Sequence, residues 1–544
     1  MRYLSENKRE DMRMKKRTAA RSMAALMGAA MVLTACGGGS TTAPTTGASS
    51  GGETQTASES AESGKITKTD IVVGQASDIV TLDPAGQQDT TSGVLMKHAY
   101  STLLDVDNEG KVVPDLAESY EMKSDTEYVF KLREDACFWD GTPVTAQDVK
   151  FSLDRAKGMP KTKSNTSKIE EVTVNGDHEV TIKLTEPYAA FKTIVTQHNL
   201  SILSEKAVTE AGDSYGDVDN LLGSGPFKVT EWVPNDHYTL VRNDNYWGEM
   251  PIATSITCRV IPEGSARTIA LEAGEIDVVW SVDPTDCANV ESNPDVKLLS
   301  QPSTGIDYVG MNTQKEKFSD KRVRQAINYA LDKQTFVDTI IEGRGLVANS
   351  YINAAIPGWT DEVEAYPYDP AKAKELLAEA GYPNGFECKI YVNGDVRTRS
   401  AQIIQAQLAE VGITVDISTY EWGALLDSLN AGEHEMFLLG WSNSSFDADG
   451  STYQLFYSGN HGATGNRAFL TDDKVDELII NAQKESDDTK RMELYKELQV
   501  YLHEISPWCP LYYKNDNVGV RADLKGFKLH KGATHYLGNC HYED

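Results

Sequence analysis

The chain has 544 residues, with 52 Lys and Arg against 81 Asp and Glu, a net charge of −29. This acidic balance argues against nucleic-acid binding, which needs basic patches, and favours a soluble protein. About 480 residues follow position 64, more than one hydrophobic core usually organises, so we expect two or more lobes.

Residues 1–35 have the features of a secretory signal peptide. Basic residues between positions 13 and 21 precede an apolar run, Met23 to Leu33, that is shorter than the roughly 20 apolar residues a membrane span needs. The run ends in Leu33-Thr34-Ala35-Cys36, which resembles a bacterial lipobox and predicts lipidation of Cys36. The alternative is an ordinary signal peptide with an incidental cysteine. Residues 36–64 have the Gly, Ser and Thr content of a flexible tether, so we expect a protein held at the outer face of a membrane.

The six cysteines after Cys36 are widely spaced, and no two form a Cys-x-x-Cys pair. This spacing predicts neither a disulfide framework nor a zinc site, and we interpret these residues as free, mostly buried thiols. Near the carboxyl terminus lie His530, His535, Cys540 and His541. Their spacing fits no compact metal-ligand pattern, so we expect no metal and no cofactor.

The stretch from 111 to 153 predicts a strand, a turn and a capped helix. Residues 127–132 alternate apolar and polar side chains, as a half-buried strand does. Asp140-Gly141-Thr142-Pro143 is typical of a turn, and Thr145 with Asp148 predicts a capping box at the start of a helix. Further on, alternation from 172 to 184 predicts a hairpin that turns at Asn175-Gly176-Asp177.

Helices and strands alternate over the rest of the chain. We expect Ser319 to cap a helix that ends near 331, and Asp369 to cap a second helix that Gly381 terminates. A third helix is predicted over 400–411, followed by a strand from Gly412. Helices near 473–485 and 488–504 precede a strand over 508–520. The predicted class is therefore α/β.

Several short sequence motifs, in a fixed order, resemble those of a known protein family. They are Leu82-Asp83-Pro84, Gly223-Ser224-Gly225-Pro226-Phe227, Arg242-Asn243 with Tyr246-Trp247, Gly274-Glu275-Ile276-Asp277, and Arg324-Gln325-Ala326-Ile327-Asn328-Tyr329-Ala330-Leu331-Asp332. From Ile71 to about Val520 the chain resembles the solute-binding proteins of peptide and nickel ABC transporters, solute-binding protein family 5.

The resemblance implies a periplasmic-binding-protein-like (type II) fold, with two α/β lobes joined by a hinge and an extra inserted domain. Two strands, near 305–311 and 507–513, are expected to cross between the lobes. The implied bounds are 65–110, 213–304 and 507–544 for lobe I, 111–212 for the inserted domain, and 305–506 for lobe II.

The strongest ligand candidate is the segment after the apolar residues 436–439. It contains Trp441, Ser442, Asn443, Ser444, Asp447 and Asp449. Short polar groups at the carboxyl end of a strand can bind a ligand where a crevice opens. The alternatives are an ordinary polar loop, a turn or a weak calcium site. Peptide-binding relatives carry an aspartate where Ser444 stands, so Asp447 or Asp449 is expected to supply the charge instead, and the loop resembles the glutathione-binding branch.

Arg397 and Arg399 form the second candidate, just before the predicted helix over 400–411. An arginine fork matches a carboxylate with two hydrogen bonds, although such residues are often solvated loop charges. The resemblance implies that one of the two binds the carboxyl terminus of a peptide. Trp422 belongs to a Glu-Trp motif that the family shares, and its ring either lines the cleft or packs in the core.

No Gly-x-Ser-x-Gly, HExxH or Ser-x-x-Lys motif precedes a fitting helix, so we expect no enzyme. A monomeric lipoprotein that captures short peptides and delivers them to an ABC permease and its ATPase is the function that the resemblance implies. Glutathione or another modified peptide, a nickel complex, and remotely a secreted hydrolase remain alternatives.

Overall fold

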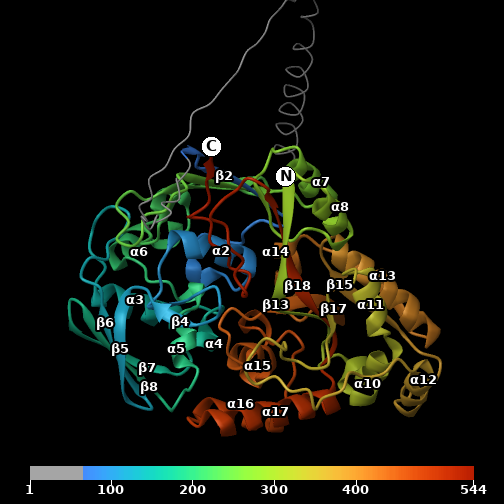
Figure 1. Cartoon of the computed structure of the whole chain (residues 1–544). Helices are drawn as coiled ribbons and strands as arrows, with labels where there is room; N and C mark the ends of the chain where they lie inside the picture. Colours follow the sequence, from blue (N-terminus) through green and yellow to red (C-terminus); the bar gives the residue numbers. More distant parts are fainter. Residues whose placement is uncertain (1–64) are drawn as a thin grey trace, which may run out of the picture. The chain divides into compact units, whose positions relative to one another are not determined.

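Residues 65–544 are described by the computed structural model, so the predicted signal peptide, Cys36 and the tether lie outside the described residues. Helices and strands alternate along this range, and the α/β class is confirmed (Figure 1). None of the helices within it combines the length and the apolar character needed to cross a bilayer. The six cysteines of this range are free, and all but Cys137 are buried, as predicted.

One sheet of eleven strands organises most of the described chain. Its order is β16-β15-β17-β13-β18-β12-β2-β11-β10-β9, with β14 paired to β18. The strands are β2 (Asp70–Gln75), β9 (Phe227–Val233), β10 (His237–Arg242), β11 (Ser255–Val260), β12 (Val278–Val279), β13 (Val296–Met311), β14 (Gly345–Val347), β15 (Glu387–Val392), β16 (Thr414–Thr419), β17 (Met436–Ser442) and β18 (Trp508–Arg521). We call β12, β2, β11, β10 and β9 the first half-sheet, and β16, β15 and β17 the second half-sheet.

The two long strands β13 and β18 join the half-sheets. They pair antiparallel from Val296 with Arg521 to Gly310 with Trp508, and the register shifts between Pro302 and Ile306. At one end β18 also pairs with β12, and at the other β13 pairs with β17. The predicted crossings at 305–311 and 507–513 fall on these two strands, which are therefore the connection about which the half-sheets can move.

Helices cover both faces of each half-sheet. On the second half-sheet, α10 (Lys321–Ala330), α12 (Pro370–Glu379) and α13 (Asp395–Glu410) share one apolar core, and α16 (Asp473–Lys484) with α17 (Asp488–Ile505) shares another. On the first half-sheet, α2 (Thr90–Ala99) packs in one core, and α7 (Gly264–Glu272) with α8 (Cys287–Ser292) packs in a second. Burial of these apolar faces is the main stabilising contribution to such a layered fold.

A separate antiparallel sheet lies within the predicted inserted domain. Its order is β5-β6-β8-β7, formed by β5 (Ala117–Ser124), β6 (Glu127–Leu132), β7 (Ile169–Gly176) and β8 (Glu179–Leu184). Helix α3 (Ala146–Lys157) shares its core and begins with the predicted Thr145–Asp148 capping box. The hairpin turns after Gly176, as predicted, while the exact bounds of the three domains stay a prediction.

Two helix starts differ from the sequence-based expectation. Helix α13 begins at Asp395, not at Ser400, because Gly394 adopts a φ of +71° that turns the chain into the helix. Arg397 and Arg399 therefore lie in its first turns and not in a preceding loop. Asp320, not Ser319, caps α10: its carboxylate accepts a hydrogen bond of 2.8 Å from the backbone N–H of Arg322.

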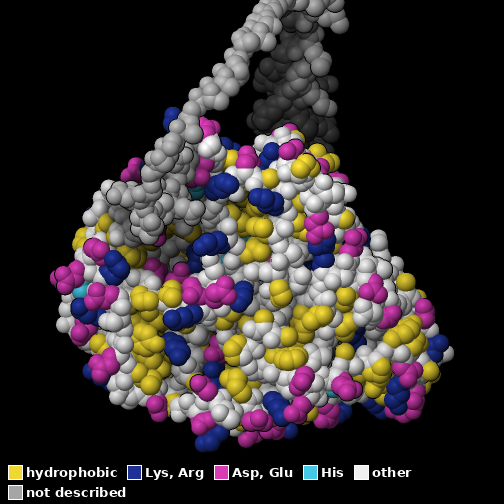
Figure 2. Space-filling model, in the orientation of Figure 1, with side chains coloured by type: hydrophobic (Ala, Val, Ile, Leu, Met, Phe, Trp, Pro, Cys, Tyr) yellow, Lys and Arg dark blue, Asp and Glu magenta, His cyan; other side chains and the backbone are white. Residues whose placement is uncertain are grey.

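Steric contacts explain the two glycines of the Gly-Ser-Gly-Pro-Phe motif. A Cβ on Gly225 would lie 2.5 Å from the backbone carbon of Ala99, and one on Gly223 would lie 2.1 Å from the oxygen of Ala99. The start of β9 therefore packs directly on the backbone at the end of α2, and only glycine permits this approach. On the face drawn in Figure 2, Lys and Arg are scattered among Asp and Glu and form no continuous basic patch.

Candidate functional site

A cavity of about 610 Å³ lies between the two half-sheets, where parallel strands of both end. In the second half-sheet β15 runs parallel to β16 and β17, and in the first β2 runs parallel to β11 and β12. The cavity is lined by the segments 76–78, 280–283, 393–397 and 420–422, which follow their strands, and by 440–445, which contains the last residues of β17 and the start of the loop after it. Ligands bind α/β sheets in the crevice outside the carboxyl ends of parallel strands, and here two such edges face one cavity.

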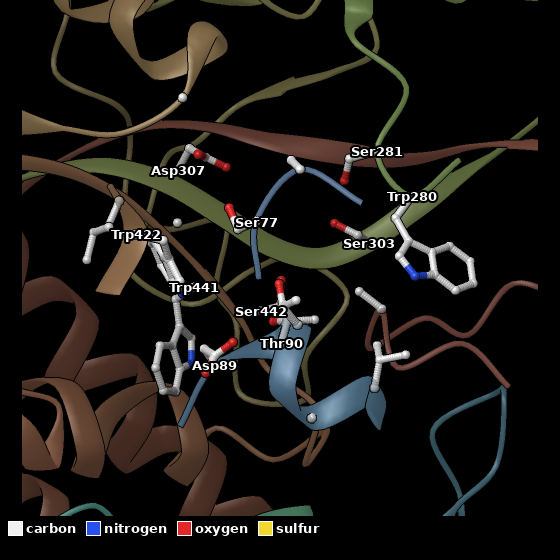
Figure 3. A pocket seen from close by; sticks show the side chains of 18 of the residues that line it. Ser77, Asp89, Thr90, Trp280, Ser281, Ser303, Asp307, Trp422, Trp441 and Ser442 are labelled. Atoms are coloured by element: carbon white, nitrogen blue, oxygen red, sulfur yellow. The ribbon is translucent and has the colours of Figure 1, made fainter. Parts of the chain in front are cut away.

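Six of the nine predicted ligand-binding residues line this cavity: Arg397, Trp422, Trp441, Ser442, Asn443 and Ser444. Figure 3 shows Trp422 and Trp441 on one side of the cavity and Trp280 on the other. The indole N–H of Trp441 donates to the carbonyl oxygen of Gly450 at 3.1 Å, which fixes its ring. The cavity therefore has aromatic walls and a polar rim, which suits a small organic ligand.

Arg397 places a guanidinium at this cavity from the first turn of α13. Its Nη1 donates to Oδ1 of Asn393 at 2.7 Å, and its Nε lies 4.0 Å from Oδ1 of the buried Asp307. Asp307 is also paired with Lys514, Oδ2 to Nζ, at 2.8 Å. The guanidinium lies 5.9 Å from the ring centre of Trp422, within range of a cation–π contact. Arg397 is thus held in place without a close carboxylate partner and can bind one from a ligand.

Arg399 is occupied within the protein. Its Nη2 lies 2.7 Å from Oδ1 and 3.0 Å from Oδ2 of Asp283, and the residue does not line the cavity. The i to i+2 spacing on a helix explains the difference, because such residues point about 200° apart. Of the two arginines, the geometry favours Arg397 as the one that meets a ligand.

Asn443 and Ser444 line the cavity while bonding to their surroundings. The amide of Asn443 donates to the carbonyl of Asp447 and to Oγ of Ser451, so it organises the loop. The hydroxyl of Ser444 donates to Oε1 of Gln197 at 3.1 Å, which links the loop to the inserted segment. For Ser442, the described residues offer its side chain no hydrogen-bond partner.

The acids Asp447 and Asp449 lie outside the cavity lining. Asp447 forms two hydrogen bonds with the guanidinium of Arg491, of 2.9 and 2.5 Å. Asp449 accepts from the hydroxyl of Tyr188 at 2.5 Å and from the amide of Gln483 at 2.8 Å. Burial, and then the charge of Asp447, raise the pKa of Asp449 to about 6. Because both carboxylates already have partners, neither is placed to supply the ligand charge that the sequence suggested.

Several cavity residues were missed by sequence reasoning. They are Gln88, Asp89, Trp280, Asp283, Asp307, Arg467 and Asp516. Asp307 gave a usable signal, since it is an acid within the otherwise apolar strand end 306–311. Asp89 showed only the pattern of a helix cap, and Arg467 follows irregular turns that no periodicity marks. Over residues 65–544, no group of three or more His, Cys, Asp or Glu is arranged to hold a metal ion.

Comparisons with known proteins agree with this geometry. The sequence model of the bacterial extracellular solute-binding proteins, family 5 (middle region), matches residues 111–463. Glutathione-binding protein GsiB of Shigella boydii serotype 4 (strain Sb227) is 32% identical over 477 residues, which cover 84% of this chain and 91% of the relative.

Two solved structures are similar over nearly their whole length. The periplasmic binding protein DppA of Helicobacter pylori, in complex with the peptide STSA, has a TM-score of 0.83 at 29% identity and covers 87% of this chain and 99% of its own. The oligopeptide-binding protein AppA of Bacillus subtilis, in complex with a nonapeptide, has a TM-score of 0.81 at 26% identity, covering 88% of this chain and 100% of its own. Proteins of this type are extracytoplasmic, non-enzymatic receptors of ABC transporters. The chain belongs to the bacterial extracellular solute-binding proteins, family 5.

Proposed function

We propose that the protein captures a short peptide in the cavity between its half-sheets and delivers it to the permease of an ABC importer. The observation that carries this proposal is Arg397, a guanidinium at the cavity wall that lacks a close carboxylate partner. The complexes of DppA with the peptide STSA and of AppA with a nonapeptide support a peptide ligand. The cavity volume of about 610 Å³ falls in the range of sites for small organic ligands.

In the proposed mechanism the carboxyl terminus of the peptide pairs with Arg397. Trp422 and Trp441 pack beside the peptide, and Ser442 offers its hydroxyl to a polar group. The half-sheets then close about β13 and β18 and exclude water, which strengthens the ion pair. Only the part of the binding free energy that differs between the open and closed forms drives this closure.

Glutathione is a second candidate for the ligand. The GsiB proteins, named as glutathione-binding, are 32% identical to this chain. The hydroxyl of Ser444 is hydrogen-bonded to Gln197. A carboxylate at this position would attract the ammonium group of any peptide, and a hydroxyl does not. A receptor without that carboxylate discriminates among peptides by other contacts, and so a narrow ligand range is expected.

Native mass spectrometry of the protein purified without its signal peptide tests the proposal. A ladder of masses fitting peptides of different lengths would establish a broad receptor, and a single mass fitting glutathione would establish a narrow one. Calorimetry on Arg397→Gln and Arg399→Gln provides the matched pair. We expect Arg397→Gln to weaken a carboxylate-bearing ligand by about tenfold or more, a loss typical of a charged hydrogen bond, and Arg399→Gln to weaken carboxylate-bearing and other ligands alike, by a smaller factor of about five. Equal effects would refute the role of Arg397.

We also propose that a lipid on Cys36 anchors the protein. Replacement of Cys36 by Ser then moves the protein from the membrane fraction to the soluble fraction of cells. Retention of Cys36→Ser in the membrane fraction would refute the anchor.

A further inference from the structure

Another arginine of the cavity lining, Arg467, lies in the segment after α15 (Asp449–Phe456). It is 7% exposed, and its Nε donates to Oδ1 of Asn430 at 3.1 Å. Its backbone carbonyl accepts a hydrogen bond of 2.8 Å from Nε2 of His434, so both ends of the residue are fixed. In the part of the chain that the structure describes, no carboxylate forms an ion pair with Arg467. A buried cation without an anion is costly, which points to a partner from outside the chain.

Asp89 presents a carboxyl group to the same cavity, and burial raises its pKa above the usual value. It caps α2 through Oδ1, which accepts from the backbone N–H of Ser92 at 3.0 Å. Its other oxygen, Oδ2, is buried and has no hydrogen-bond partner among residues 65–544. Both polar atoms of the neighbouring Gln88 side chain are likewise buried and unpartnered within this range. Buried polar atoms of this kind are rare in folded proteins, and three of them on adjacent cavity residues form a cluster of unused acceptors and donors.

Electrostatic effects relate these groups to one another and to Arg397. Burial lowers the pKa of Arg467, and the charge of Asp89 acts in the opposite direction. Burial and the charge of Arg467 lower the pKa of Lys161, and the charges of Asp89 and Asp427 act in the opposite direction. Burial raises the pKa of Tyr308, and the charges of Arg467 and Arg397 both oppose that rise. Since Tyr308 lines the cavity, the two arginines flank one ligand space.

We propose that Asp89 and Arg467 form a second subsite for an α-amino-acid head group, in which Asp89 binds the ammonium and Arg467 binds the carboxylate of the same carbon. A second carboxylate of the same ligand then pairs with Arg397. This subsite rests on the proposed peptide-binding function and names the ligand class: peptides joined through a side-chain carboxylate, such as γ-glutamyl peptides.

The difference between an α-linked peptide and a γ-glutamyl peptide explains why we propose the latter as the ligand. A peptide with ordinary α-linkage carries an ammonium at its amino end but no carboxylate on that carbon, because the carboxylate has become the first peptide bond. Such a ligand would satisfy Asp89 and leave Arg467 buried without an anion. A γ-glutamyl peptide brings both charges, so it satisfies both groups.

Calorimetry with three matched ligands tests the subsite. They are glutathione, 4-aminobutyryl-cysteinylglycine, which lacks only the α-carboxylate, and glutaryl-cysteinylglycine, which lacks only the α-ammonium. We expect each deletion to weaken binding to the native protein by about tenfold or more, as the loss of a charged hydrogen bond does. This comparison needs no variant and is independent of any effect on folding.

The variants then assign each charge. Arg467→Gln should abolish the preference for the α-carboxylate while retaining that for the ammonium, and Asp89→Asn should do the reverse. Arg397→Gln should weaken all three ligands alike. Equal binding of the three ligands by the native protein, or variants that leave both preferences unchanged, would overturn the subsite. Binding of α-linked peptides alone, in a manner that depends on Arg397, would refute the subsite and leave the proposed function standing. If no peptide binds, both proposals fall.

Discussion

Arg399 on α13 and Asp283 after β12 form an ion pair that joins the two half-sheets, with Nη2 of Arg399 2.7 Å from Oδ1 of Asp283. Asp283 is 6% exposed at its side chain, whereas Arg399 is 35% exposed, so solvent screens part of the attraction. Because movement about β13 and β18 would separate the half-sheets, the pair can form only while they are close together. It therefore favours the closed arrangement.

We expect Arg399→Gln to raise the Kd of any ligand by about fivefold, which corresponds to ~1 kcal/mol for a partly exposed pair. Calorimetry measures the affinity, and small-angle scattering should show a larger radius of gyration for the ligand-free variant. Arg322→Gln is the control, since Arg322 pairs with Asp320 at the start of its own helix. If Arg399→Gln behaves like this control, the pair has no role in closure.

The pair of Asp447 and Arg491 is a structural ion pair with a distinct signature. Its side chains are 14% and 6% exposed, so removal of one partner leaves a buried charge. We expect Asp447→Asn to reduce the free energy of unfolding by about 3 kcal/mol, measured by denaturant titration. Ligand affinity should be measured at a denaturant-free condition in which the variant is folded. Because Asp447 does not line the cavity, we expect only an indirect effect on affinity, a change of less than about threefold.

Glu362→Gln serves as the comparison for Asp447→Asn. Glu362 pairs with Lys496 and is 59% exposed, so its loss should have little effect on stability. If Asp447→Asn greatly weakened ligand binding but kept its stability, Asp447 would be a ligand-binding residue and not a structural one.

Local sequence patterns predicted most of the fold. The alternation at 127–132, the capping box at Thr145 and the turn at Gly176 depend on neighbours within a few residues, and all three occur in the structure. The position of the Trp441 loop at a strand's carboxyl end was also readable, because the apolar run 436–439 sits directly before it.

Contacts between residues that are distant in sequence could not be predicted from local sequence patterns. Asp447 pairs with a residue 44 positions away, and Asp449 bonds to Tyr188, 261 positions away. A carboxylate in a polar loop has the same local pattern whether it meets a ligand or an arginine of its own chain. The same limit hid Arg467, whose proposed role depends on Asp89, a cavity residue that is distant in sequence.

The glycine at position 225 should not tolerate a side chain. A Cβ there would lie 2.5 to 2.6 Å from backbone atoms of residues 98–100, which cannot move without shifting α2. We expect Gly225→Ala to lower the free energy of unfolding by ~3 kcal/mol, the cost of overpacking a rigid site. Gly176→Ala is the control, because no atom lies within 4 Å of its Cβ position. Equal stability of the two variants in denaturant titrations would contradict the steric account.

The stability of the protein should fall in acid partly through His98. The ring is buried on α2, where Nδ1 lies 2.7 Å from the carbonyl of Val94 and Nε2 accepts from the backbone N–H of Leu537 at 3.0 Å. These two bonds require the neutral ring with its hydrogen on Nδ1. Burial lowers the pKa of His98 to about 4 from its usual value of 6.5.

Between pH 6.5 and 4 the unfolded chain binds a proton at His98 that the folded protein does not bind. Stability from this group is therefore fully present above pH 6.5 and is lost as the pH falls toward 4, by ~3 kcal/mol for a shift of this size. We expect His98→Gln to be less stable than the native protein at pH 7, with the gap between them narrowing by that amount at pH 4. Denaturant titrations of both proteins across this range measure the gap, and other histidines cancel because they titrate in both. A gap that stays constant with pH would show that folding does not lower the pKa of His98.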